Sequence, residues 1–569
     1  MTQEATPQSV AASFDGVRVD AAAMALEQRG DQLWAEFDDP DDLRPSRQPP
    51  SPPGGTEVAA AARRIKRQVV LTTGSHNQQI YWYATGHGRT LGQLPAIWLV
   101  DERRWIPRRA AVMHPPGQAA FSETGAWNGV CVACHTTLGR PAFDTPFGSQ
   151  PIGTQQVDTT AAEFGVACEA CHGPADAHVR RNANPRRRYA SHLTRASDSS
   201  IVHPARLDPR RSAQICGQCH SFWEFEDQAA ERAANSRGLP YRPGDDLRQT
   251  RFIVQPTADA GSAIMRRFLQ DDPGFIRDIF WSDGMVRATG REYNALIDSP
   301  CYKNATDDQR TLTCASCHTM HQTADDPRAV TEWADDQLKR SAIGSGNGAC
   351  LDCHLAQGFR PAIAGQKPRA TLTGDVSEHT HHRGDSTGSV CMNCHMPYTT
   401  YGLLKTIRSH QISNPSVKAT LDTGRPNACN LCHLDRTLAW TAEYLERWYR
   451  IQKPALDADQ QAVAASVLAL LKGDAGQRAI VAQSLGWAPA QQASGTGWMA
   501  PYLALMQQDA YDAVRHIATR SRATLPAFRR DALPRNNREL LLNADGTFDA
   551  ETVNRLVRAR DNRKISYRE

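Results

Sequence analysis

The chain has 569 residues, a formal net charge of +4 at pH 7 and a hydrophobic fraction of 40%. These values fit a globular protein of two to four domains with an apolar core. No apolar run approaches the about 18 residues that a membrane-spanning helix needs, so the expected architecture excludes a transmembrane segment.

The first part of the chain, residues 1–115, predicts a small β-rich unit. β-branched and aromatic residues occur there in short runs, within residues 13–38 and 66–110, and Gly and Asp interrupt these runs. The alternation of apolar and polar residues in QLWAEF and QIYWYA is typical of strands. Between the two regions, RPSRQPPSPPGG (44–55) predicts an extended, exposed loop.

The cysteines follow a repeated pattern. Fifteen are present, and fourteen of them form pairs with the spacing C-x-x-C, each followed directly by histidine. The motifs are Cys131/Cys134/His135, Cys168/Cys171/His172, Cys216/Cys219/His220, Cys314/Cys317/His318, Cys350/Cys353/His354, Cys391/Cys394/His395 and Cys429/Cys432/His433. Only Cys301 lies outside the pattern.

C-x-x-C-H is the attachment signature of c-type haem. The two thiols form thioethers with the porphyrin vinyl groups, and the adjacent histidine reaches the iron as its proximal axial ligand. A zinc knuckle or a redox dithiol also uses paired cysteines, but neither needs a histidine directly after the second one. The motifs therefore predict seven covalently bound haem c groups in this chain.

All of these motifs lie within a predicted multihaem domain, residues 116–435. Seven haems in this region leave little room for an ordinary apolar core. The porphyrins are therefore expected to supply most of the buried surface. Short helices and long ligand-bearing loops are the expected structure there.

The remaining residues, 436–569, predict a helical domain. Helical apolar spacing occurs in 436–450, 457–474, 475–487 and 509–525. Asp474, and Asp509 or Asp512, occupy positions expected of N-caps. The similarity between two of these segments favours HEAT-like repeats, and an unrelated helical bundle is the alternative. The expected fold class is thus mainly α, with a small N-terminal β-rich unit.

Twelve histidines lie outside the motifs and are candidates for distal axial ligands. Bis-histidine ligation suits electron transfer, whereas an iron without a distal ligand can bind substrate. The predicted distal ligands are His178, His321, His382, His410 and His76. For His87, His114, His192 and His203 the question stays open, and His516 is expected to have no such role. Met320 and Met396 are expected to pack against a porphyrin.

Three of these histidines crowd into the segment EHTHHRG. His382 is predicted to bind the iron of another motif's haem, with His381 as the nearest alternative. His379 is expected to lie near a propionate or to be exposed.

Two further features allow more than one interpretation. Cys301 is interpreted as a buried, inert thiol, or together with Tyr302 as a catalytic candidate that binds or protonates a small oxyanion beside a haem. The basic run 180–189 is expected to be a solvated surface; alternatively, it pairs with propionates or steers an acidic redox partner.

Several stretches resemble bacterial multihaem c-type cytochromes of the cytochrome c554 / hydroxylamine oxidoreductase / multihaem nitrite reductase superfamily, in a subgroup with a HEAT-like helical C-terminal domain. They are GVACEACHGPADAH (165–178), HPARLDPRRSAQICGQCH (203–220), SPCYKN…LTCASCHTMH (299–321), CMNCHMPYTTYGLL (391–404) and GRPNACNLCHLDRTLAW (425–440). The resemblance implies periplasmic or cell-surface electron transfer over stacked bis-histidine haems, with some relatives acting on nitrogen or sulfur oxyanions. Such proteins usually begin with an export signal and a further C-x-x-C-H. We therefore expect that this sequence starts late, with an eighth haem encoded upstream.

The leading hypothesis is an electron carrier that works between redox partners outside the cytoplasm, in the periplasm or another oxidising compartment. Its expected partners are redox proteins such as a membrane quinol-oxidising complex or another cytochrome, and no nucleic acid. The alternative is an oxidoreductase acting on nitrite, hydroxylamine or a sulfur oxyanion at one five-coordinate haem. A docking subunit is a third hypothesis. No C-x-x-C-K motif occurs, which disfavours a typical multihaem nitrite reductase.

Overall fold

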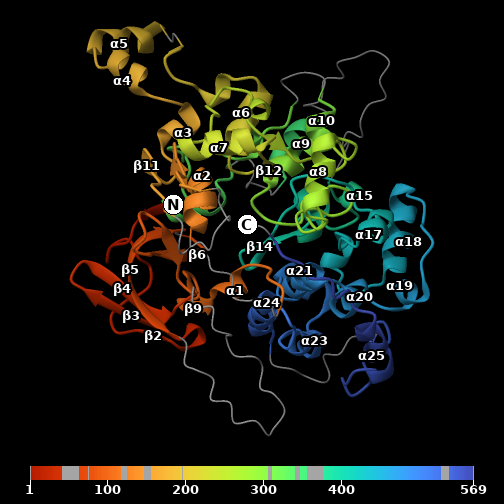
Figure 1. Cartoon of the computed structure of the whole chain (residues 1–569). Coiled ribbons are helices and arrows are strands. Elements are labelled where there is room, and N and C mark those ends of the chain that lie inside the picture. Colours follow the sequence, from red (N-terminus) through yellow and green to blue (C-terminus); the bar gives the residue numbers. More distant parts are fainter. Residues whose placement is uncertain are drawn as a thin grey trace. The chain divides into compact units, whose positions relative to one another are not determined.

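The computed structural model is described at residues 2–40, 63–74, 76–116, 125–145, 156–194, 197–305, 311–339, 347–354, 376–526 and 537–567. The predicted loop 44–55 lies outside these residues. The chain divides into two compact units. The first contains Met1–Ala111, Gly117–Cys219 and Trp223–Ile253, and the second contains Val112–Pro116, His220–Phe222 and Val254–Glu569. The structure is about 40% helical, and Figure 1 shows its strands concentrated near the N-terminus.

An antiparallel sheet forms the N-terminal part of the first unit. Its strands follow the order β2-β3-β4-β5-β6-β8-β9, while β1 pairs with β5 and β7 pairs with β6. Their bounds are β1 Thr2–Glu4, β2 Arg18–Val19, β3 Met24–Arg29, β4 Gln32–Asp38, β5 Arg64–Thr73, β6 Gln78–Ala84, β7 Leu91–Gln93, β8 Ala96–Leu99 and β9 Arg104–Pro107. The strands predicted in QLWAEF and QIYWYA are confirmed as β4 and β6.

One face of this sheet carries the core of the first unit. Leu33, Ala35 and Phe37 of β4 are all buried, because alternate side chains of a strand point to the same face. They belong to one apolar cluster with Phe14 and Tyr81. This clustering explains why the alternation in the sequence predicted the strand.

A second cluster joins the sheet to the first C-x-x-C-H motif. Leu71 of β5 and Trp82 of β6 pack with Trp127 and Val132, and Cys131 packs against the cluster. Trp127 and Val132 lie in two short helices, η2 (Trp127–Cys131) and α2 (Val132–His135). The sheet is therefore the platform that positions the first motif.

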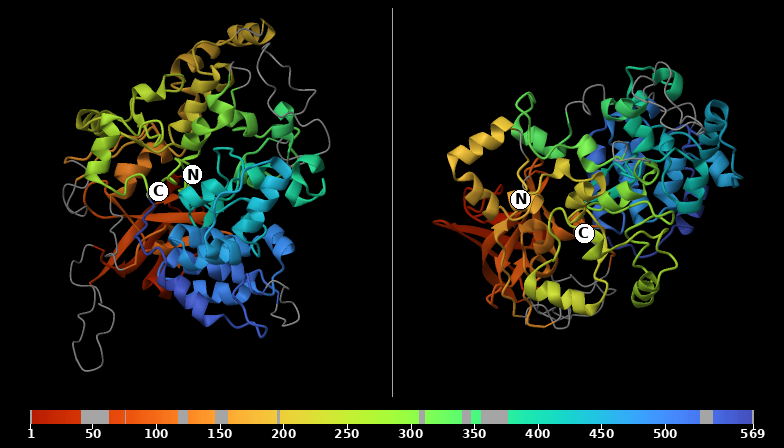
Figure 2. Two further views of the ribbon diagram at one scale, coloured as in Figure 1. Left: turned by 90° about the vertical axis from the view of Figure 1, so that its right-hand side faces the viewer. Right: turned by 90° about the horizontal axis from the view of Figure 1, so that it is seen from above.

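Short helices and ribbons make up the rest of the first unit. They are α1 Arg108–Ala111, α3 Cys168–His172, α4 Asp176–Asn182, α5 Pro185–Thr194, α6 Pro209–Gly217 and α7 Gln228–Arg237, with the ribbons β10–β11 (Thr136–Thr137, Glu163–Phe164) and β12–β13 (Trp223–Glu224, Phe252–Ile253). Helices α4 and α5 stand clear of the sheet in each view (Figures 1 and 2).

Among its described residues, the second unit is mainly helical. Its helices begin with α8 Ala263–Asp271, α9 Glu292–Asp298, α10 Pro300–Lys303, α11 Cys314–Cys317, α12 Val330–Asp336, α14 Gly348–His354, α15 Val376–Thr380, α16 Cys391–His395 and α17 Val417–Thr423. They continue with α18 Leu438–Tyr449, α19 Ala458–Ala462, α20 Ala465–Lys472, α21 Ala475–Leu485, α22 Ala488–Ser494, α23 Met499–Met506, α24 Asp512–Ala523 and α25 Ala550–Arg558. One ribbon, β14–β15 (Thr400–Gly402, Lys405–Ile407), lies among them.

The predicted C-terminal helices are confirmed, with one break. The segment 457–474 forms two helices, α19 and α20, because the backbone is extended at Val463 and Ala464. Asp474 caps α21 as predicted, accepting a hydrogen bond from the Gln477 backbone N–H. Pairing of these helices as repeats stays a prediction.

The predicted N-cap of α24 is wrong. The residue before this helix is Tyr511, and Asp512 is its first residue. Asp509 instead accepts a hydrogen bond from the Tyr511 backbone N–H and pairs with buried Arg478 at 2.7 Å. The carboxylate of Asp509, which the local sequence pattern predicted as a helix cap, thus forms a long-range ion pair with Arg478.

A second buried ion pair ties the C-terminal helices to the 277–288 segment. Arg287 donates from Nη2 to both carboxylate oxygens of Asp474 at 2.9 Å, and from Nε to the Tyr567 hydroxyl at 3.1 Å. Both charged side chains are buried, with exposed fractions of 4% and 5%. Within the described residues, no helix combines the length and apolarity needed to span a bilayer.

Candidate haem sites

Every C-x-x-C-H motif lies on or directly after a short helical element. Helices α3 and α16 consist of the motif alone, and the seventh motif begins in the short helix η8 (Cys429–Leu431). Residues three apart on a helix share a face, so both thiols of a pair point to one side. All fifteen cysteines are described, and no disulfide joins any of them. Each motif thus offers two thiols and an imidazole locally, as haem attachment requires.

In the first unit, the cysteines of three attachment motifs lie close to one another. The Cys219 thiol lies 3.9 Å from the carbonyl oxygen of Cys134. Gln218, inside the third motif, donates a hydrogen bond of 2.8 Å to the carbonyl of Ala170, inside the second. Burial raises the pKa of Cys171, and the nearby Cys216 thiol adds to that shift. Cofactors attached at these positions would be close neighbours.

In the second unit, one buried side chain links the fifth and sixth motifs. Asn347 donates a hydrogen bond of 2.8 Å to the Ser389 carbonyl and accepts one of 2.8 Å from the Cys391 backbone N–H. The Cys350 and Cys391 thiols also share a hydrogen bond, which raises the pKa of Cys350. This asparagine therefore holds the two attachment sites in a fixed relationship.

The seventh motif lies beside the sixth. Burial raises the pKa of Cys429 and of Cys432 to about 12, and the Cys394 thiol adds to each shift. The thiols are accordingly held in their neutral form.

Among the described residues, the Nδ1 atom of several histidines contacts an oxygen atom. Because a carbonyl oxygen can only accept, Nδ1 carries the proton where a carbonyl is the partner, and Nε2 keeps its lone pair for a metal. The contacts are His172 to Val202 O at 2.8 Å, His395 to Ser413 O at 3.2 Å, His382 to Thr380 O at 2.6 Å, His410 to Arg408 O at 3.1 Å, His178 to Asp198 Oδ2 at 2.9 Å and His220 to Glu292 Oε2 at 2.8 Å. Such bonds orient the imidazoles of metal sites.

Among the described residues, three imidazole pairs have the spacing that two ligands on opposite sides of one iron would have. Two rings that share a metal through Nε2, each at about 2 Å from it, have centroids roughly 6 Å apart. The pairs are His318 with His410 (6.4 Å, planes at 21°), His395 with His379 (6.2 Å, 12°) and His433 with His382 (6.0 Å, 27°). Each joins the histidine of a motif to one from outside the motifs.

The crowded segment 379–382 serves two of these pairs. His379 faces His395 and His382 faces His433, whereas His381 stacks on Trp448 with centroids only 4.4 Å apart. The sequence interpretation gave His379 no ligand role. The helix α15 ends at Thr380, so the spacing of His379 and His382 gave no signal of a shared helical face.

Gly388 makes room for the His382 ring. A Cβ at this glycine would meet His382 Cδ2 at 2.3 Å and Cγ at 2.5 Å. Both are atoms of the imidazole ring, so they cannot move away unless the whole ring moves. The absence of a side chain at Gly388 thus leaves the space that the ring of this candidate ligand occupies.

The other predicted distal ligands lie in different parts of the chain. His76 lies exposed between β5 and β6, and His321 is exposed after α11. His178 lies on α4, where its ring contacts Asp198. The side chain of His192 lies outside the described set.

The catalytic candidates lie near the fourth motif. Tyr302 is buried and Cys301 half-buried on α10. Burial raises the pKa of Cys317, and the thiols of Cys350, Cys353 and Cys301 add to the shift. Cys301 is therefore a neighbour of that motif.

Apolar side chains next to the motifs fit a porphyrin. Val130, Val166 and Met320 lie within two residues of a motif and are 50%, 51% and 50% exposed. Side chains of this kind are normally covered. A haem held by the adjacent thiols would cover them, so the residues present fit the group that the motifs imply.

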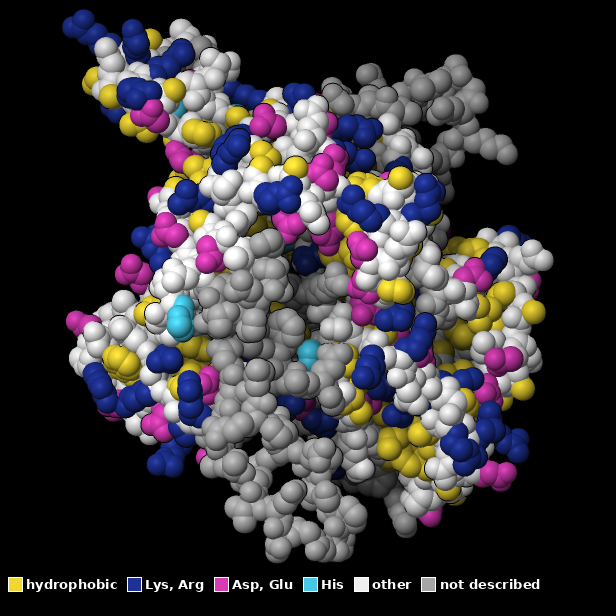
Figure 3. Space-filling view, in the orientation of Figure 1, with side chains coloured by type: hydrophobic (Ala, Val, Ile, Leu, Met, Phe, Trp, Pro, Cys, Tyr) yellow, Lys and Arg dark blue, Asp and Glu magenta, His cyan; other side chains and the backbone are white. Residues whose placement is uncertain are grey.

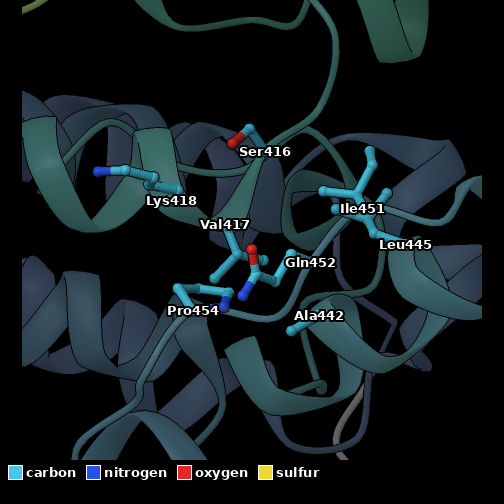
Figure 4. Close-up of a pocket in the computed structure, with 8 residues that line it drawn as sticks. All are labelled: Ser416, Val417, Lys418, Ala442, Leu445, Ile451, Gln452 and Pro454. Carbon is cyan, nitrogen blue, oxygen red and sulfur yellow. The ribbon is translucent and has the colours of Figure 1, made fainter.

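A separate pocket lies between the start of α17 and the end of α18 (Figure 4). It is lined by Ser416, Val417 and Lys418, by Ala442 and Leu445, and by Ile451, Gln452 and Pro454. Its volume of about 20 Å³ admits roughly one water molecule. It is too small to be a cofactor site.

Arginines gather over helices α4 and α5 (Figure 3). Arg186, Arg187 and Arg188 are exposed and make no ion pair within the described residues. Tyr189 and Leu193 of the same helix are 62% and 80% exposed. This surface is strongly basic.

The chain is similar to known proteins in two comparisons. A family model described as cytochrome c552 matches residues 376–493, which include the last two motifs and the 379–382 segment. No curated protein matches the chain. Among solved structures, the crystal structure of the outer cell wall cytochrome OcwA aligns with a TM-score of 0.41 and 18% identity, covering 80% of this chain and 88% of that one. The family match supports a c-type cytochrome with covalently bound haem.

Proposed function

We propose that the chain is a multihaem c-type cytochrome that carries electrons between redox partners through seven covalently bound, mostly bis-histidine haems. The observation that carries this proposal is the set of three imidazole pairs with centroids 6.0–6.4 Å apart. When bound, haem iron supplies one-electron transfer. The paired thiols would hold the porphyrins, and the three imidazole pairs would each bind one iron.

The paired cysteines are the proposed attachment points, and the histidine of each motif is the proposed proximal ligand. We assign His410, His379 and His382 as the distal partners of His318, His395 and His433, on the distances given above. His178, His321 and His76 stay proposed ligands without an assigned iron. The division into residues 1–115, 116–435 and 436–569 is likewise part of the proposal.

The proposed location is outside the cytoplasm. Covalent attachment of haem needs thiols that are handled in an oxidising compartment. The proposed partners are redox proteins, such as a quinol-oxidising membrane complex or another cytochrome. The basic surface of α4 and α5 is suited to binding a redox partner with an acidic surface.

The alternative function is an oxidoreductase acting on nitrite, hydroxylamine or a sulfur oxyanion. Cys301 and Tyr302 would then serve a haem at the fourth motif. The pairing of His318 with His410 argues against that position, because the two imidazoles would leave that iron no free site for a substrate. An active haem would have to lie at another motif.

The test is the haem content and spin state of the purified protein. We expect seven haems per chain in a pyridine haemochrome assay and predominantly low-spin ferric signals in EPR. A content near zero would overturn the proposal. A high-spin signal from one haem that responds to added nitrite or hydroxylamine would favour the alternative.

A further inference from the structure

The proposed proximal histidine of the third motif, His220, differs from those of the second and sixth motifs in the group that its Nδ1 atom contacts. His172 and His395 donate from Nδ1 to neutral backbone carbonyls. His220 contacts a carboxylate, Glu292 Oε2, at 2.8 Å. An anionic acceptor pulls the Nδ1 proton harder than a carbonyl does, so it increases the electron donation of Nε2.

Glu292 is held in place at the first residue of helix α9. Its other oxygen, Oε1, accepts a hydrogen bond of 3.0 Å from the Gly290 backbone N–H. The next residue, Tyr293, donates its backbone N–H to the His220 carbonyl at 2.9 Å. The carboxylate and the histidine are therefore fixed to each other through both side chain and backbone.

A third contact completes this attachment. The Asn294 side chain accepts from the Phe222 backbone N–H at 2.6 Å and donates to the Phe222 carbonyl at 3.1 Å. Asn294 is buried, so these bonds are protected from water. Three successive residues of α9 thus hold the segment that follows Cys219, and Glu292 is the one directed at the imidazole.

We propose that Glu292 is a positioning residue that lowers the reduction potential of the haem bound at the third motif, through its contact with His220. This proposal rests on the proposed function, because it requires His220 to bind iron. Stronger donation from Nε2 stabilises the ferric state over the ferrous state. The third haem then accepts an electron at a lower potential than it would without the carboxylate.

The test is a redox titration of the purified, haem-loaded protein, followed in the α-band. Glu292→Gln keeps an acceptor oxygen but removes the charge. It is expected to raise the reduction equilibrium constant of one haem at least tenfold, which corresponds to 59 mV for one electron. About one seventh of the absorbance change should shift, since one haem of seven is affected most. Glu292→Asp keeps the charge and is expected to shift the same step by less.

Asp298→Asn is the matched control. Asp298 lies at the other end of α9 and contacts Gln255 at 3.0 Å and Lys303 at 2.7 Å, so its loss removes the same charge without a proposed ligand as partner. Its titration curve should match that of the unmodified protein. Unchanged curves for both Glu292 variants, with seven low-spin haems still bound, would overturn the role of Glu292 alone. Failure of the unmodified protein to bind haem would instead overturn the proposed function.

Discussion

His382 and His433 face each other with ring centroids 6.0 Å apart, although they come from separate segments of the chain. The Nδ1 bond from His382 to the Thr380 carbonyl holds one ring, and the space left by Gly388 admits it. His433 is fixed by its motif. Long-range folding, and not local spacing, brings this pair together.

Replacing His382 with Ala should convert one haem from low-spin to high-spin, because the iron at the seventh motif loses its proposed distal ligand. Low-temperature EPR and the visible spectrum of the ferric protein measure this change. His381→Ala is the matched control, since His381 stacks on Trp448 instead. The opposite pattern, with only the His381 variant high-spin, would reassign the ligand.

Replacing Gly388 with Ala should have a milder effect of the same kind. The new Cβ would stand 2.3 Å from Cδ2 of His382, which is too close, and would push that ring out of line with the iron. We expect a mixture of low-spin and high-spin signal from one haem. Gly261→Ala is the control, because nothing lies within 4 Å of a Cβ there. Equal spectra for both variants would contradict the claim that Gly388 leaves the space needed by the His382 ring.

Replacing Arg287 with Ala should destabilise the second unit strongly. The change leaves Asp474 buried without its partner, which costs about 3–5 kcal/mol, and removes the bond to Tyr567. Urea denaturation followed by circular dichroism measures the loss. Lys418→Ala breaks an exposed pair with Asp422 and should cost less than about 1 kcal/mol. Similar losses for the two variants would contradict the role of burial.

The pair of Asp459 with Arg555 should stabilise the fold in a pH-dependent way. The hydrogen bond from Arg555 lowers the pKa of Asp459 in the folded chain. Its contribution is therefore present above the ordinary Asp pKa of about 3.9 and is lost as the pH falls through the lowered value. Asp459→Asn should cost at most about 1 kcal/mol at neutral pH, since Arg555 is about half exposed. Urea midpoints should converge for the two proteins in strong acid; a constant difference would contradict the linkage.

Charge reversal on α5 should alter electron exchange with charged small molecules. Arg186, Arg187 and Arg188 create a positive field that attracts anions at low ionic strength. Changing all three to Glu should slow oxidation of the reduced protein by ferricyanide several-fold and speed oxidation by the cationic hexaammineruthenium(III). Stopped-flow rates in low and high salt measure both effects. Equal changes for the two oxidants would show that the field is not the cause.

Sequence reasoning succeeded where a property is local. The C-x-x-C-H spacing alone places two thiols and an imidazole on one turn, and the alternation in β4 reports a face buried against the sheet's core. It was insufficient where distant segments meet. Nothing near His379 indicates that it faces His395, and nothing near Asp509 indicates that Arg478 takes its carboxylate from the cap of α24.

The side-chain amide of Asn347 bears on the proposed transfer of electrons between the haems of the fifth and sixth motifs. It bonds to the backbone at Ser389 and at Cys391, so it sets the interval between the fifth and sixth attachment sites without contacting a ligand histidine. Electron tunnelling slows steeply as the gap between donor and acceptor widens. In the proposed relay, the distance between the haems of the fifth and sixth motifs would therefore depend on this one buried amide.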